Sequence, residues 1–150
     1  MDRRPALQLS DDEVDAFLRE HGVGVLSLAA DGDAYGLPIS YGYDGDDRLI
    51  CLQFADAPWS RKRDFVTTTR TASFTVFELR DDLRATSVVA QGPLSPADDD
   101  EVPDALSALA DNAVFTALDE SGVPIEEADL RLFWLKPRTL TGRRFDPFGD

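Results

Sequence analysis

The amino-acid sequence predicts a mostly β fold, namely a small antiparallel β-barrel of six strands with a few helices. Short runs rich in β-branched and aromatic residues recur along the 150-residue chain. Asp-Gly pairs, which favour tight hairpin turns, separate the first three of these runs. The length fits one domain over residues 1–150 and is sufficient to bury a core.

A capping box predicts the first helix. Ser10 is expected to be its N-cap, and Glu13 follows three residues later. The apolar residues after Glu13 recur with helical spacing and fall on one face. Gly22 is expected to end the helix, because glycine readily adopts the conformation found just beyond a helix C-terminus.

Three strands joined by tight turns are expected next, as an antiparallel meander. Turns are predicted at Asp31-Gly32 and at Asp44-Gly45. Proline cannot donate a hydrogen bond to a β ladder, so Pro38 indicates an edge or an irregular position in the second strand. The three strands are expected over residues 23–28, 35–43 and 48–54.

The second half of the chain is expected to add two helices and three strands. Ser60 is the predicted N-cap of the first of these helices. The helices are expected over residues 60–68 and 104–118, and the strands over residues 71–79, 86–94 and 130–135. Residues 139–150 are expected to form a tail.

The chain is strongly acidic, with 29 acidic and 15 basic side chains and a net charge of -14. Such a surface repels itself in dilute buffer and benefits from screening by salt. This composition indicates adaptation to a high-salt cytoplasm, as in halophiles, and a merely acidic mesophilic protein is the alternative. General nucleic-acid binding is disfavoured, because phosphate contacts need a positive surface.

Several classes of protein are disfavoured by what the sequence lacks. No apolar run is long enough to span a bilayer, and no apolar stretch follows Arg3 and Arg4 as in a secretory signal. Cys51 is the only cysteine, so no internal disulfide or multi-thiolate metal site is expected, and cytoplasmic residence follows as the default. Cys51 lies in an apolar run and is expected to be a buried structural thiol. His21 is the only histidine and has no evident support for a catalytic triad.

One dense basic segment, residues 60–63 (Ser-Arg-Lys-Arg), stands out in this acidic chain. Three adjacent cations repel one another unless an anion neutralises them. The segment is expected where a loop becomes a helix, and helix N-termini favour anions. Arginine and lysine together give a phosphate charge-assisted hydrogen bonds. The alternative is that these cations pair with Asp56 and Asp64 on a solvated face.

The order of the motifs is more specific than any one of them. A strand and an Asp-Gly turn are followed by Pro-Ile-Ser-Tyr-Gly-Tyr-Asp-Gly, a strand, Ser-Arg-Lys, a short helix and a Ser-Phe-Thr-Val strand. This order resembles the pyridoxamine 5′-phosphate oxidase-like FMN-binding split-barrel family, over roughly residues 9–144. The resemblance implies a six-stranded antiparallel split barrel that binds FMN at the interface of a homodimer. With the acidic composition, it indicates a halophilic, archaeal-type member.

The resemblance also implies site residues. Arg61 and Lys62, with Ser60 before them, correspond to the pair that binds the FMN phosphate in that family. A second matching segment runs beside the flavin ring and contacts it largely through its backbone. That segment consists of Pro38, Ile39, Ser40 and Tyr41.

Two further positions follow from later strands. Ser87 is the best match to a residue that offers a polar side chain to the flavin. Trp134 lies on the closing strand, which in the family often approaches the flavin from the second subunit. The aromatic side chains of Tyr41, Phe54 and Trp59 could line a flat slot for the flavin ring. The alternative is that these side chains pack in the hydrophobic core.

The departures from the family pattern limit the predicted function. The segment after Thr139 has no histidine, and Lys136-Pro137-Arg138 does not match the motif that holds pyridoxamine phosphate, so vitamin B6 oxidation is not expected. Asp56 near a phosphate would repel it, which leaves the deazaflavin F420 as an alternative cofactor. The predicted function is an FMN-dependent oxidoreductase of unknown substrate. The alternatives are a non-catalytic flavin-binding or storage module, an F420-dependent reductase, and an interaction domain without a cofactor.

Overall fold

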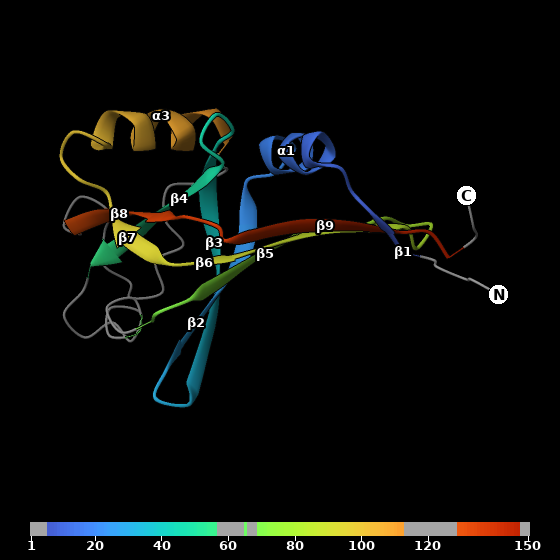
Figure 1. Ribbon diagram of the computed structural model, residues 1–150, viewed down its shortest axis with the longest axis horizontal. Coiled ribbons are helices and arrows are strands. Elements are labelled where there is room, and N and C mark those ends of the chain that lie inside the picture. The colour runs from blue at the N-terminus through green and yellow to red at the C-terminus, as the bar shows by residue number, and fades with distance from the viewer. Residues whose placement is uncertain (1–5, 57–64, 66–68, 113–128, 148–150) are drawn as a thin grey trace.

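The computed structural model describes residues 6–56, 65, 69–112 and 129–147, and these residues form nine strands and two helices (Figure 1). In chain order the elements are β1 (Ala6–Gln8), α1 (Asp11–Glu20), β2 (Val23–Ala30), β3 (Asp33–Asp44), β4 (Leu49–Asp56), β5 (Ala72–Leu79), β6 (Ala85–Gly92), β7 (Leu94–Pro96), α3 (Val102–Asn112), β8 (Asp129–Leu135) and β9 (Thr139–Phe145).

All the strands join one antiparallel sheet in the order β1-β9-β6-β5-β2-β3-β4-β8-β7. The predicted mostly β, antiparallel fold is therefore confirmed, and β2, β3 and β4 form the predicted meander. In Figure 1 both helices lie above the sheet, α3 over its β7–β8 side and α1 over its β9 side. Among the described residues, no helix is both long and apolar enough to cross a membrane.

The predicted number of six strands is wrong, because β1, β7 and β9 add three more. β1 and β7 have only three residues each, which is too short for a pattern in the sequence, and β7 ends at Pro96. β9 lies in the segment that the sequence predicts to be a tail, and most of its side chains are polar. The backbone holds it instead, since β9 pairs with β6 on one side and with β1 on the other.

The capping box and the first hairpin turn, which depend on local sequence, are confirmed, whereas α1 ends at Glu20 with His21 as its C-cap, and Gly22 does not adopt a positive φ. Ser10 Oγ accepts a hydrogen bond from the Glu13 N–H at 3.2 Å, and Glu13 Oε1 accepts one from the Ser10 N–H at 3.0 Å. Asp31 and Gly32 both have positive φ, as a tight hairpin turn requires. The predicted helix at residues 104–118 is observed as α3, and residues 113–118 lie outside the described residues. The predicted helix at residues 60–68 also lies outside them, except for Phe65, which is buried.

The buried apolar side chains of the described residues form two clusters. In the larger one, directly paired residues form a row across β3, β2, β5, β6 and β9. This core row consists of Leu37, Leu26, Phe74, Ala90 and Leu140. The smaller cluster lies beneath α3, where Cys51 and Trp134 pack against Ala105, Ala108 and Leu109.

Gly42 sets how closely α3 approaches the sheet. A Cβ atom at this position would lie 2.4 Å from the backbone carbon of Ala108 and 2.4 Å from the backbone nitrogen of Leu109. Real Cβ atoms do not approach backbone atoms so closely, so any side chain here would push α3 away from β3. The smaller cluster depends on this contact, because α3 forms its cover.

We expect Gly42→Ala to lower the free energy of unfolding by about 1–3 kcal/mol, the usual cost of overpacking a filled core. Gly36→Ala is the matched control on the same strand, because the nearest atom to a Cβ there is 3.9 Å away. Urea unfolding of both variants and the wild type in the same high-salt buffer would measure the difference. Equal losses in the two variants would contradict the close approach of α3.

Candidate functional site

The two predicted site residues Pro38 and Ser87 lie on the same face of the sheet. Pro38 lies opposite Val25, and Val25 lies opposite Thr75. Thr75 lies opposite Val89, and Ser87 is two residues from Val89 on β6. Residues two apart on a strand share a face, so the register places all five together. Three strand spacings separate Pro38 from Ser87, which is roughly 14 Å across the sheet.

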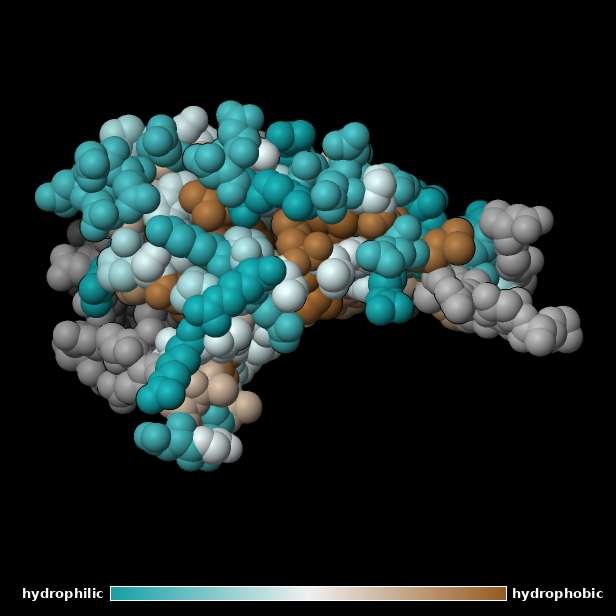
Figure 2. Space-filling model, in the orientation of Figure 1, coloured by the Kyte–Doolittle hydropathy of each residue, from teal (hydrophilic) through white to brown (hydrophobic). Residues whose placement is uncertain are grey.

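This face, which we term the outer sheet face, is opposite the core row and carries exposed apolar side chains. Phe77 is 62% exposed and lies opposite Ser87, and Leu79 is 65% exposed and lies opposite Ala85. Phe145, opposite Ala85 on β9, is also exposed. On the side of the molecule drawn in Figure 2, which labels none of these residues, the apolar atoms lie mainly between the helices and the sheet, with hydrophilic residues around them. Phe77 and Leu79 are not among the predicted site residues, although their spacing of two residues is the signal for a shared face.

In the rest of the predicted ring-binding segment, Ile39 and Tyr41 point inward, and Ser40 is buried although it shares a face of β3 with Pro38. Ile39 and Tyr41 belong to the larger core cluster, and Tyr41 is fully buried. The Tyr41 hydroxyl donates a hydrogen bond to the Leu18 carbonyl oxygen at 2.8 Å. The Ser40 hydroxyl donates to the Gly22 carbonyl oxygen at 3.0 Å. These side chains hold the end of α1 against the sheet, so any contact of this segment with a ring has to come from Pro38 or from the backbone.

β3 has different neighbours along its length. It pairs with β2 over residues 33–40, and with β4 only over Tyr41 to Asp44. Within the described part of the chain, Pro38 therefore lies beyond the β3–β4 ladder, where a missing N–H costs no ladder bond. The prediction that Pro38 marks an edge position is confirmed. Contact of this backbone with a flavin stays a prediction.

Trp134 lies away from the outer sheet face. Its side chain is only 2% exposed and packs beneath α3 beside Cys51. Its indole Nε1 is buried and has no hydrogen-bond partner among the described residues. The register does not bring Trp134 together with Pro38 or Ser87, because it pairs with Cys51 on β4 and Ser95 on β7. Its contact with a flavin stays a prediction.

Ser60, Arg61 and Lys62 lie outside the described residues, as do the side chains of Phe54 and Trp59. The chain leads into this segment from β4, which ends at Asp56. The candidate phosphate clamp therefore follows the end of β4 that is remote from the β3–β4 turn. Whether Arg61 and Lys62 bind a phosphate stays a prediction.

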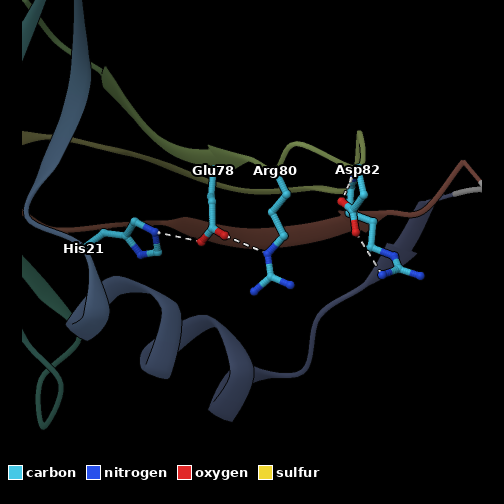
Figure 3. A network of polar contacts seen from close by, with 5 residues as sticks. His21, Glu78, Arg80 and Asp82 are labelled. Carbon is cyan, nitrogen blue, oxygen red and sulfur yellow. Dashed lines mark hydrogen bonds and ion pairs between the residues drawn. The ribbon is translucent and has the colours of Figure 1, made fainter.

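His21 has a structural environment (Figure 3). Its ring stacks on Phe17 with 4.1 Å between the ring centroids, and its Nδ1 lies 2.9 Å from the Phe17 carbonyl oxygen. Its Nε2 lies 3.2 Å from Glu78 Oε2, and Glu78 Oε1 accepts a hydrogen bond from Arg80 Nε at 2.9 Å. The Arg80 contact, with His21 acting in the same direction, holds the pKa of Glu78 below its usual range. The network ties the end of α1 to β5.

Metal and thiol chemistry find no support in the described residues. No group of three or more His, Cys, Asp or Glu side chains among them is arranged to hold a metal ion. Cys51 is fully buried, as predicted, and burial raises the pKa of its thiol to about 12. A thiol with so high a pKa is protonated at neutral pH and is a poor nucleophile.

We expect Cys51 in the folded protein to react with iodoacetamide at least about a hundredfold more slowly than a free thiol at pH near 8, because so little thiolate is present. Mass spectrometry would follow the alkylation over time. The same protein in urea is the control and should react at the ordinary rate. Rapid labelling of the folded protein would show that α3 does not cover this cysteine.

Comparison with known proteins places these features in a family context. A family model described as pyridoxamine 5′-phosphate oxidase matches residues 10–144. Among curated proteins no match is found.

Solved structures share the fold. An FAD-binding protein from Mesorhizobium loti matches with a TM-score of 0.73 and 22% identity, over 94% of this chain and 99% of that chain. The FAD and heme binding protein from Mycobacterium smegmatis has a TM-score of 0.71 and 20% identity, over 98% and 76%. An FAD binding protein from the same organism has a TM-score of 0.69 and 17% identity, over 93% and 98%. At these identities the likeness establishes the fold alone.

Proposed function

The chain belongs to the pyridoxamine 5′-phosphate oxidase family, and on this premise we propose that it binds FMN and works as a flavin-dependent oxidoreductase. The observation that carries the proposal is the place of the dense basic segment, which follows β4 in a chain of this family with a net charge of -14. Three proteins of the same fold are named for FAD, which supports a flavin as the class of cofactor.

The phosphate of the flavin would be held by Arg61 and Lys62, with Ser60 beside them. Arginine presents a planar fork of donors and lysine a compact charge, and both form charge-assisted hydrogen bonds with a phosphate. A dianion also removes the repulsion between adjacent cations. In this arrangement the basic segment fixes one end of the cofactor.

The ring would lie against the outer sheet face. The described residues fit a flat, partly apolar ligand there, since Val25 and Val89 are partly exposed and Ser87 offers a hydroxyl. A bound flavin supplies the redox chemistry, and the protein orients it and excludes water. Ser87 would donate a hydrogen bond to the ring, while the backbone near Pro38 would contact its edge. The missing histidine on β9 gives no support for a vitamin B6 substrate.

A homodimer would complete this site. Pro38 and Ser87 of one copy are roughly 14 Å apart, far beyond the reach of one hydrogen bond. The exposed side chains of Phe77 and Leu79 lie on the same face and favour burial against another apolar surface. A second copy on this face would cover them and enclose the ring between two subunits.

We expect protein purified in high salt to show flavin absorption bands, and the released cofactor to be FMN when compared with FAD and F420 standards by chromatography. Arg61→Ala with Lys62→Ala should weaken FMN binding by at least about a hundredfold, because each charge-assisted hydrogen bond contributes about 1.5–3 kcal/mol. Riboflavin, which lacks the phosphate, should bind both proteins equally. Arg80→Ala with Arg84→Ala is the matched control, because it removes two cations from the β5–β6 hairpin.

Three outcomes would count against parts of this proposal. Unchanged FMN affinity in the Arg61 and Lys62 variant would exclude the clamp. Wild-type protein that binds none of FMN, FAD or F420 would leave the interaction domain as the function. Flavin bands that no reductant bleaches under anoxia, NAD(P)H included, would indicate a carrier rather than an oxidoreductase.

We expect Leu79→Glu to convert the dimer to monomers and to release the flavin, because a buried carboxylate on each copy would face an apolar surface. Sedimentation velocity and the ratio of flavin to protein would measure both effects. Leu106→Glu is the matched control, because Leu106 is 49% exposed but lies on α3. A Leu79→Glu protein that remains dimeric with full flavin content would place the interface elsewhere.

A further inference from the structure

A second group of cations lines a cavity of about 470 Å³ at the bend between β8 and β9. Lys136 and Arg138 come from the bend itself, and Arg48 comes from the turn between β3 and β4. Among the residues that the structure describes, Asp47 is the one acidic residue that lines the cavity. Three cations against one acid is the reverse of the balance in the whole chain, which has 29 acids and 15 bases.

The ion pairs of the described residues set this cavity apart from the groove beside α1. That groove also contains three arginines, but each has an acidic partner there or nearby: Arg80 pairs with Glu78, Arg84 with Asp82, and Arg144 with Glu13. Within the same described part of the chain, the side chains of Lys136 and Arg138 form no ion pair. Their charges are therefore available to an anion in the cavity.

Arg48 is held in place on the other wall. Its Nε donates a hydrogen bond to Asp15 at 3.2 Å, and its Nη1 lies 3.8 Å from an Asp11 oxygen. Its Nη2 has no hydrogen-bond partner among the described residues, so the acids of α1 do not use all the donors of this guanidinium. Arg48 therefore adds a fixed, partly neutralised charge, while Lys136 and Arg138 supply the uncompensated ones.

The backbone fixes the positions of Lys136 and Arg138. The Lys136 N–H donates to the Pro93 carbonyl oxygen at 3.1 Å, and the Arg138 N–H donates to the Gln91 carbonyl oxygen at 2.7 Å. A Cβ on Gly92 would lie only 2.1 Å from the Lys136 carbonyl oxygen. The backbone of the bend therefore packs against Gly92 so closely that no side chain fits between them. A pair of cations on so constrained a backbone loses less conformational entropy when it binds a ligand.

The cavity lies at the end of β4 that adjoins the β3–β4 turn. Leu49, at the start of β4, lines the cavity, whereas the basic segment at residues 60–63 follows the end of β4 at Asp56. A strand of this length spans roughly 23 Å. The cations of the bend therefore lie at the other end of β4 from the point where the chain continues toward the basic segment, which itself lies outside the described residues.

We propose that this cavity is a second anion site, which takes the phosphoryl group of a small hydroxylated phosphomonoester. Lys136 and Arg138 would bind the phosphoryl oxygens through charge-assisted hydrogen bonds. The volume lies within the range of small-molecule sites, about 300–1,000 Å³, and leaves room for more than an ion. Asp47 would repel a bare anion but would accept a hydrogen bond from a sugar hydroxyl, which favours the ester over inorganic phosphate.

The test uses the full-length, flavin-loaded protein labelled with ¹⁵N, at one ionic strength set with KCl. Ribose 5-phosphate, inorganic phosphate and ribose are titrated separately, and the amide signals of Lys136, Arg138 and Arg48 are followed. We expect saturable shifts with both phosphoryl compounds and none with ribose. Tighter binding of ribose 5-phosphate would assign the site to the ester, and equal affinities would assign it to inorganic phosphate.

A matched pair of variants decides the role of the bend. Lys136→Gln with Arg138→Gln should weaken phosphoryl binding at least tenfold while leaving the flavin content unchanged. Arg80→Gln with Arg84→Gln removes the same charge elsewhere and should leave the affinity as it is. Equal affinity in both variants, or shifts that additional KCl alone reproduces, would overturn the proposal. Circular dichroism and flavin content would show that each variant is folded.

Discussion

The register of the ladder β3-β2-β5-β6-β9 is the constraint on which the core and the candidate site both depend. It places Leu26 and Phe74 in one row inside the molecule, and Val25 and Thr75 in the next row outside. A slip of one residue would exchange the two rows, so burial of the core row fixes the outer sheet face as well. The surface proposed for the flavin ring is thus specified by the residues packed behind it.

The sequence was sufficient where a few neighbouring residues decide the structure, and insufficient where distant ones do. The capping box at Ser10 and the turn at Asp31 are local, and both are observed. β9 is not local: its polar residues have little strand pattern, and its place depends on β6 and β1. The family, by contrast, was recognisable from the order of motifs, which survives when each motif is loose.

Candidate site residues could be located along the chain but not oriented in space. Pro38 and Tyr41 belong to one predicted segment, yet Pro38 is exposed and Tyr41 is fully buried with its hydroxyl on Leu18. Trp134 is on the expected strand, but α3 packs over it. No short-range sequence pattern predicts that packing. Side-chain direction follows from register and from helix packing, which a list of motifs does not contain.

The pairing of β1 with β9 has a consequence for synthesis of the protein. Ala6 lies opposite Phe145, so β1 cannot form its pairing with β9 until about 140 further residues have been synthesised. Until that partner leaves the ribosome, β6 also has one edge without its neighbour. Open strand edges are where nascent chains mispair and aggregate, so the sheet is most vulnerable before translation of its last strand is complete.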